Sequence, residues 1–201
     1  MCWLNKVSPS ISLGLSDGEK HSKKTIHLSD RIIVLMRGLP GSGKSTWLKE
    51  HGCEDYTISP DGFRIALSPP VTLSNGERVV NHNMSGEAWG LASNVFSARI
   101  SHLRGNPCGA TFFDATLLNE ITFKTLLRII EEEAWGDVEV IVIDFTYLSL
   151  EEVLRRNATR KGTLHYVAES VIENMWLSRN KIDLSKYNVE VYHPEDVEVL
   201  P

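Results

Sequence analysis

Three things are scarce in this sequence: cysteine, net positive charge and long apolar runs. Its cysteines, Cys2, Cys53 and Cys108, are widely spaced and include no CxxC pair. This excludes a disulfide framework and a zinc knuckle, and it predicts a protein of a reducing compartment. The formal charge of −5 excludes a general attraction to nucleic acid, so any such contact requires a local basic patch. No apolar run approaches the length of a membrane span, and the amino terminus lacks the apolar segment of a secretory signal. We therefore expect a cytoplasmic protein without a membrane partner.

The chain of 201 residues is long enough for one α/β domain with a full core. Residues 1–29 mix Ser, Lys and Gly without a sustained period, and we expect them to form a loosely ordered extension before a single domain at residues 30–201. From residue 31, apolar runs such as RIIVLM and VEVIVIDF alternate with segments of helical spacing. This alternation predicts an α/β fold with a central parallel sheet flanked by helices. Residues 68–83 carry Pro, Asn and Gly and indicate a loop or a small hairpin.

The stretch MRGLPGSGKSTW follows the first apolar run and fits the pattern G-x-x-x-x-G-K-[ST]. Glycines let consecutive backbone N–H groups converge on phosphate oxygens, and the helix that follows presents its positive end to the same anion. Lys44 would bridge the β- and γ-phosphates of ATP, and the Ser45 hydroxyl would bind Mg²⁺. A tight glycine turn is the alternative, but it requires neither the lysine nor the hydroxyl. The predicted ATP-binding residues here are Gly38, Pro40, Gly41, Ser42, Gly43, Lys44, Ser45 and Thr46.

The rest of the sequence narrows the class of P-loop protein. No N/T-K-x-D guanine signature occurs in the chain, which argues against a GTPase. A motor ATPase would usually need a longer chain, whereas this length suits a small phosphotransferase.

A candidate acceptor motif, SPDGFR, follows the second predicted strand, YTIS. Asp61 would then lie at the carboxyl end of a strand, where open α/β sheets bind their ligands. A carboxylate there can take the proton from an attacking hydroxyl, and Arg64 can hold a phosphate of the acceptor. The alternative is a helix-capping aspartate with an arginine on a solvated face.

Two acids compete for the metal position. Asp114 ends the apolar run in FFDATLLN and Asp144 ends the run in VIVIDF. A carboxylate at a strand end can hold the magnesium or its water, and either residue can instead cap the following turn.

A basic cluster, RRNATRKG, stands out in an acidic protein. Arg156 and Arg160 lie one helical turn apart and could close over the transferring phosphates as a lid, where their charge would offset that of the γ-phosphoryl oxygens. The alternative is a solvated helix end that complements the helix dipole.

Together, GLPGSGKSTW, SPDGFR, DATLLN and RRNATRKG resemble, in order, the motifs of the P-loop polynucleotide 5'-hydroxyl kinases of phages and bacterial RNA-repair systems. The resemblance covers about Ile32 to Met175. The segment PPVTLSNGERVVNH does not align with the family's pattern, and Pro60 is unusual before the acid.

The resemblance implies a P-loop kinase fold with a helical arginine lid and a role for each matching residue. Asp61 would be the general base and Arg64 would grip the neighbouring phosphate of the acceptor. Arg156 and Arg160 would bind the ATP phosphates, with Arg160 counted with Lys44 and Asp61 as catalytic. Asp114 would support the metal with Ser45. Thr116 and Asn119 would line the acceptor side.

These motifs predict an ATP- and Mg²⁺-dependent kinase whose acceptor is the 5'-hydroxyl of DNA or RNA, located in the host cytoplasm if a phage encodes it. A kinase of hydroxymethylated pyrimidines such as 5-hydroxymethyluracil within phage DNA is an alternative, because loops such as 68–83 decide which hydroxyl enters. A small-molecule or nucleotide kinase is another. A third class is an ATP-switched binding module that hydrolyses slowly and recruits partners.

Overall fold

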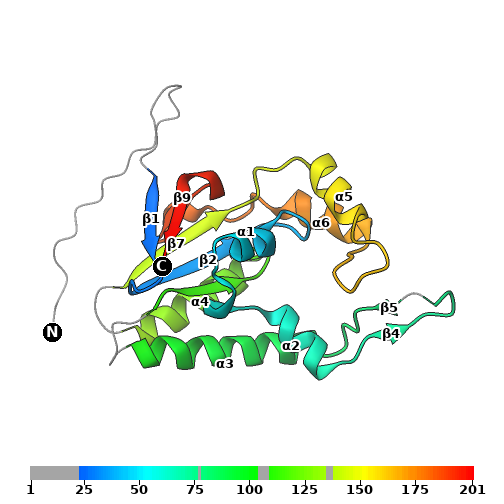
Figure 1. Cartoon of the computed structure of the whole chain (residues 1–201), viewed down its shortest axis with the longest axis horizontal. Helices are drawn as coiled ribbons and strands as arrows, with labels where there is room; N and C mark the ends of the chain where they lie inside the picture. The colour runs from blue at the N-terminus through cyan, green and yellow to red at the C-terminus, as the bar shows by residue number, and fades with distance from the viewer. Residues whose placement is uncertain (1–22, 77, 104–108, 135–137) are drawn as a thin grey trace.

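The computed structural model describes residues 23–76, 78–103, 109–134 and 138–201, with a five-stranded parallel sheet at its centre (Figure 1). The strand order is β3-β6-β2-β7-β8. The strands are β2 Ile32–Arg37, β3 Thr57–Ile58, β6 Thr111–Asp114, β7 Glu139–Asp144 and β8 Glu190–Tyr192. Every residue of the central strand β2 is buried, as expected for an apolar run covered on both faces.

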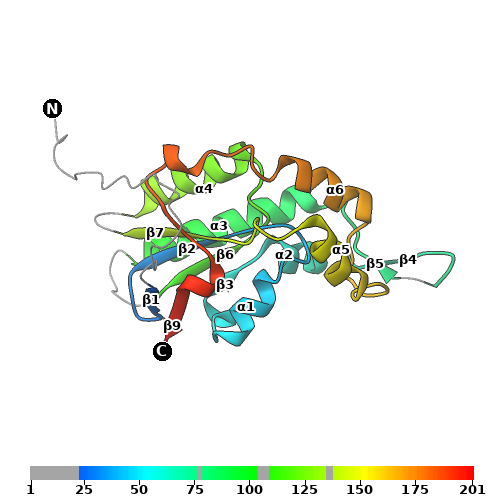
Figure 2. The same ribbon diagram turned by 90° about the horizontal axis from the view of Figure 1, so that it is seen from above.

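Helices cover both faces of this sheet (Figure 2). Trp47 of α1 packs on Val34 on one face, and Phe96 of α3 and Phe123 of α4 pack with Leu35 on the other. The helices are α1 Lys44–Glu50, α2 Pro60–Leu67, α3 Ser85–Leu103, α4 Glu120–Glu133, α5 Leu150–Ala158 and α6 Glu169–Ser178, with 3-10 turns at Glu54–Tyr56, Leu184–Lys186 and Pro194–Asp196. The predicted α/β fold with a helix-flanked parallel sheet is confirmed. Among the described residues, no helix has the length and apolarity to cross a bilayer.

The helices α5 and α6 and the loop between them, residues 150–178, form the lid. Val153 of α5 and Ile172 of α6 are fully buried and pack with Leu39 and Leu118, which follow β2 and β6. The lid therefore has its own small core, and that core lies directly on the loops that leave the carboxyl ends of the central strands.

The boundary expected at residue 29 is wrong for its last residues. β1 (Lys24–His27) pairs in parallel with β9 (Val197–Leu200), so residues 24–27 belong to the fold. Ile26 is fully buried in the core beside Val197, and the alternation of Lys24, Thr25, Ile26 and His27 is too short to stand out without its partner strand. Residues 1–22 lie outside the described part of the chain.

The segment 68–83 contains a small hairpin, one of the two forms that its composition predicts. β4 (Val71–Thr72) pairs antiparallel with β5 (Arg78–Val79), and Gly76 takes a positive φ of 80° at the turn between them. We call residues 68–76 and 78–83 the arm, because they project from the body of the molecule (Figure 1).

The role of β1 can be tested by removing its buried side chain. We expect Ile26→Ala to lower the free energy of unfolding by about 2–5 kcal/mol, because it leaves a cavity between the two sheets. Thr25→Ala is the matched control: Thr25 is exposed on the same strand, and its loss should cost less than about 1 kcal/mol. Urea unfolding of both variants measures this, and equal stabilities would show that β1 contributes no core.

Candidate active site

The phosphate loop joins β2 to α1 and is shaped by glycines. Gly41 and Gly43 have positive φ values of 86° and 103°. A Cβ on Gly41 would lie 3.1 Å from the carbonyl oxygen of Val153, and one on Gly43 would lie 3.2 Å from Nη1 of Arg156. Both glycines are therefore required for backbone conformation and for the close approach of α5.

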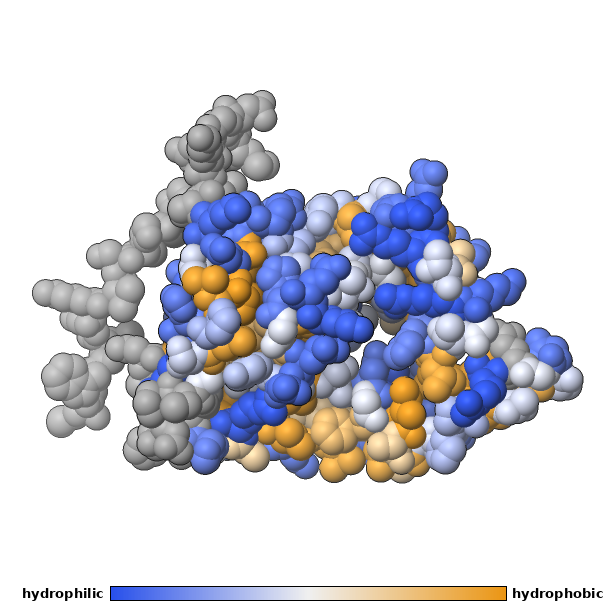
Figure 3. All heavy atoms as spheres, viewed as in Figure 1, coloured by the Kyte–Doolittle hydropathy of each residue, from blue (hydrophilic) through white to orange (hydrophobic). Residues whose placement is uncertain are grey.

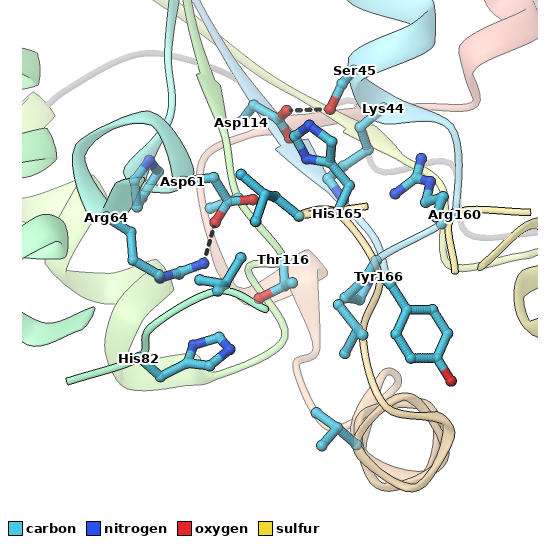
Figure 4. A pocket seen from close by; sticks show the side chains of 18 of the residues that line it. Lys44, Ser45, Asp61, Arg64, His82, Asp114, Thr116, Arg160, His165 and Tyr166 are labelled. Carbon is cyan, nitrogen blue, oxygen red and sulfur yellow. Dashed lines mark hydrogen bonds and ion pairs between the residues drawn. The ribbon is translucent and has the colours of Figure 1, made fainter. Parts of the chain in front are cut away.

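Lys44 begins α1 and is buried in the loop. Its Nζ donates hydrogen bonds to the carbonyl oxygens of Gly38 (2.9 Å) and Leu39 (3.2 Å). Burial lowers the pKa of Lys44, while the nearby charges of Asp114 and Asp61 raise it and that of Arg160 lowers it. The same four charged groups thus surround one space, as Figure 4 shows.

Ser45 and Asp114 form the candidate metal position. The Ser45 hydroxyl donates to Oδ2 of Asp114 at 3.0 Å (Figure 4), and the register places Asp114 of β6 beside Met36 of β2. No group of three His, Cys, Asp or Glu side chains able to hold a metal occurs in the described ranges. An oxygen pair of this kind fits Mg²⁺, which keeps several waters and takes phosphate oxygens as its other ligands.

The competing acid, Asp144, already has other partners. Its Oδ2 accepts from Nη1 of Arg37 at 2.6 Å, and its Oδ1 accepts from the backbone N–H of Thr146 at 2.8 Å. Arg37 is buried at the end of β2 and also donates to Thr146 Oγ1 and to the carbonyl oxygen of Arg179. This geometry favours Asp114 for the metal, because binding at Asp144 would leave the buried Arg37 without its ion pair.

Asp61 and Arg64 lie together on α2 and line the same cavity (Figure 4). Arg64 Nη1 donates to Asp61 Oδ1 at 2.7 Å. The helix is capped by Ser59, whose hydroxyl accepts from the Asp61 N–H, so Asp61 is not the cap that the alternative required. Pro60 fits here because it takes the first helical position, which lacks an N–H partner in any case.

The two lid arginines point to different places. Arg160 lines the cavity, whereas Arg156 donates through Nη1 to the carbonyl oxygen of Ser42 at 3.1 Å and through Nε to Glu152 at 2.6 Å. Hydrogen bonds from Arg155 and Arg156 lower the pKa of Glu152 to about 2. Arg156 therefore holds the backbone of the phosphate loop in this structure instead of facing the cavity.

Of the predicted site residues Thr116, Asn119 and Thr46, one lines the cavity and two do not. Thr116 lines the cavity, and its carbonyl oxygen accepts from the Gly38 N–H at 3.0 Å. Asn119 is not in the cavity lining; its Oδ1 caps α4 by accepting from the N–H groups of Ile121 and Thr122. Thr46, one residue beyond Ser45 in α1, is exposed and is not in the lining either.

The cavity has a volume of about 900 Å³ and extends beyond the predicted residues. The phosphate loop and α2 supply its polar side. The lid adds His165 and Tyr166, the arm adds Val79, Val80 and His82, and α3 adds Trp89. No motif marks these residues, because a lone histidine or a short apolar pair has no distinctive spacing. The arm residues and Trp89 lie between two motifs in the chain, and His165 and Tyr166 follow the last motif; this position is the only signal that could have found them.

Solved structures with a similar fold include a chain of the Pnkp1/Rnl/Hen1 RNA repair complex, at 20% identity and a TM-score of 0.54, covering 84% of this chain and 49% of that one. A chain of the native AvrRxo1-ORF1:-ORF2 complex matches at 18% identity and a TM-score of 0.55, covering 82% and 55%. The same complex with ATP matches at 18% identity and a TM-score of 0.53, covering 82% and 55%.

The chain thus spans about half the length of these structures, and at such identities the likeness establishes the fold alone. No curated protein matches the sequence. The model of the family AAA_33, described as an AAA domain, matches residues 33–181, well over half of the chain. The phosphate loop, the parallel sheet and this match together show that the chain belongs to the AAA_33 family and has the fold of the P-loop kinases.

Proposed function

We propose that the protein is an ATP-dependent phosphotransferase that transfers the γ-phosphate to the 5'-hydroxyl end of DNA or RNA. One observation carries this proposal: Asp61, with Arg64 beside it, lines the same cavity as Lys44, Asp114 and Arg160. A phosphate-binding loop alone would suit any nucleotide hydrolase. A carboxylate facing that loop across a shared cavity is what a hydroxyl acceptor needs.

On the phosphate side, the backbone N–H groups of Gly43, Lys44 and Ser45 at the start of α1, together with the Lys44 ammonium, bind the β- and γ-phosphates. Arg160 faces the same space and offsets the charge that spreads over the γ-phosphoryl oxygens. Mg²⁺ held at Ser45 and Asp114 supplies further charge neutralisation when it is bound. Arg156 keeps the loop in place through its bond to Ser42.

On the acceptor side, Asp61 takes the proton of the attacking hydroxyl. Arg64 uses Oδ1 of Asp61, so we assign Oδ2 to the acceptor proton. The ion pair also fixes the orientation of Asp61, and Arg64 retains further N–H groups for the phosphate that follows the terminal nucleoside. Because the transition state is loose, most of the acceleration comes from positioning and charge neutralisation, and the base contributes less.

The proposal is tested by phosphate transfer from γ-labelled ATP to two DNA acceptors. One has a free 5'-hydroxyl; the other has blocked 5' ends and carries 5-hydroxymethyluracil inside the strand. We expect label on the first alone, removable by a phosphatase that acts at 5' ends. Label on the second alone would replace the proposal with a kinase of modified bases.

Substitutions at the two sides of the cavity separate a kinase from an ATP-switched binding module. We expect Lys44→Ala to abolish both ATP binding and transfer, and Asp61→Asn to bind ATP normally while its kcat falls by about a hundredfold or more. Asp55→Asn is the control, because Asp55 is exposed on the 3-10 turn before β3 and does not line the cavity. Full transfer by Asp61→Asn would contradict the assignment of the base.

The role of Arg156 as a support of the loop is tested against its neighbour. Both arginines bind Glu152, but only Arg156 also binds Ser42. We expect Arg156→Ala to raise the Kd of ATP by about tenfold, because the loop loses a charge-assisted hydrogen bond. Arg155→Ala should leave the Kd within about twofold of the wild type. Calorimetric titration measures both, and equal effects would assign the loss to Glu152 instead.

A further inference from the structure

The cavity has apolar walls that the proposed chemistry does not use. Val79 and Val80 of the arm line it from one element, and Val167, Val171 and Met175 of the lid line it from another. In Figure 3 the surface is hollowed between the lid and the arm. Apolar side chains from two separate elements therefore face one solvent-accessible space.

The arm is held close to the catalytic groups by the helices at its two ends. It follows α2, which carries Asp61 and Arg64, and it leads to α3. Trp89 of α3 lines the cavity and packs edge-on against Phe113, with 5.5 Å between the ring centroids. A ligand group that rests on the arm thus lies next to the carboxylate that we assign to the acceptor hydroxyl.

The charges of the cavity indicate what the apolar walls bind. Among the described residues that line the acceptor side, Arg64 is the one arginine or lysine, because Lys44 and Arg160 face the phosphate loop. Arg78 of the arm is exposed and is not in the lining. A site that held a nucleic acid by its backbone would place several cations along the strand. Apolar walls with a polar rim, here His82 and Thr116, instead suit a flat heteroaromatic ring.

We propose that the arm and the lid form a base clamp, in which Val79 and Val80 on one side and Val171 and Met175 on the other enclose the nucleobase of the acceptor nucleotide. This inference rests on the proposed function and names the part of the acceptor that the site recognises. The clamp binds the ring, Arg64 binds the phosphate that follows, and Asp61 receives the hydroxyl proton.

The test measures the activity of two variants, each with two acceptors. The acceptors are a short oligonucleotide with a 5'-hydroxyl and the same oligonucleotide whose 5'-terminal sugar carries no base. The variants are Val80→Ala, which shortens the arm's wall, and Leu73→Ala, a matched apolar change on the same arm at a residue that is 43% exposed and outside the lining. KM and kcat are measured for the four combinations and for the wild type.

We expect Val80→Ala to raise the KM of the base-bearing acceptor by about tenfold with kcat unchanged, because the lost contact acts on binding alone. It should leave the KM of the abasic acceptor unchanged, and Leu73→Ala should change neither. The clamp is overturned if Val80→Ala affects both acceptors equally or affects neither.

A direct measurement of nucleoside binding tests the clamp independently of the proposed function. Adenosine and thymidine are titrated into the wild type, Val80→Ala and Leu73→Ala, without ATP. If no oligonucleotide is phosphorylated, but nucleosides bind and Val80→Ala weakens their binding, the clamp stands and the proposed transfer fails. If oligonucleotides are phosphorylated but nucleosides do not bind and the abasic acceptor reacts equally well, the clamp fails and the transfer stands.

Discussion

The structure of the site depends on the close approach of α5 to the phosphate loop. The carbonyl oxygen of Val153 and the guanidinium of Arg156 reach positions where a Cβ on Gly41 or Gly43 would crowd them, and Arg156 closes the contact with a hydrogen bond to Ser42. One helix thereby supports the loop and anchors the lid. Arg160, which follows the end of α5, lines the cavity. Glycine in this loop has two functions: it frees N–H groups for phosphate and admits a second helix.

The sheet register explains why two similar acids have different roles. Asp114 lies beside Met36 and Asp144 lies beside Arg37, on opposite sides of the central strand. A buried guanidinium next to Asp144 needs a counter-charge, whereas Asp114 accepts its hydrogen bond from the uncharged Ser45 hydroxyl. The Arg37 side chain of β2 thus gives Asp144 a structural role and leaves Asp114 as the candidate metal ligand, although both acids end apolar strands of the same sheet.

The parallel sheet and the phosphate loop are predictable from the sequence, whereas β1 and the directions of several side chains depend on contacts between distant segments. The phosphate loop, Asp61 with Arg64, and Asp114 follow from local spacing, because each motif lies within one strand-to-helix junction. The sequence does not indicate β1, because a four-residue strand is recognisable only when its partner strand is known, and that partner, β9, lies far along the chain. The sequence does not give the directions of the Arg156 and Asn119 side chains: in the structure Arg156 binds the loop backbone and Asn119 caps α4. The choice of Asp114 over Asp144 needed the position of Arg37, which no motif records.

The pairing of β1 with β9 also has a consequence for how the protein folds during synthesis. Lys24 pairs with Val197, so the first described strand waits for a partner strand that is synthesised much later. The core face under α1 includes Ile26 and Val197 and stays incomplete until then. Contacts of such high sequence separation form slowly, because a long loop must close before they contribute stability. The lid and the opposite face of the sheet use residues that emerge earlier, so the nascent chain can assemble its cavity before it closes its core.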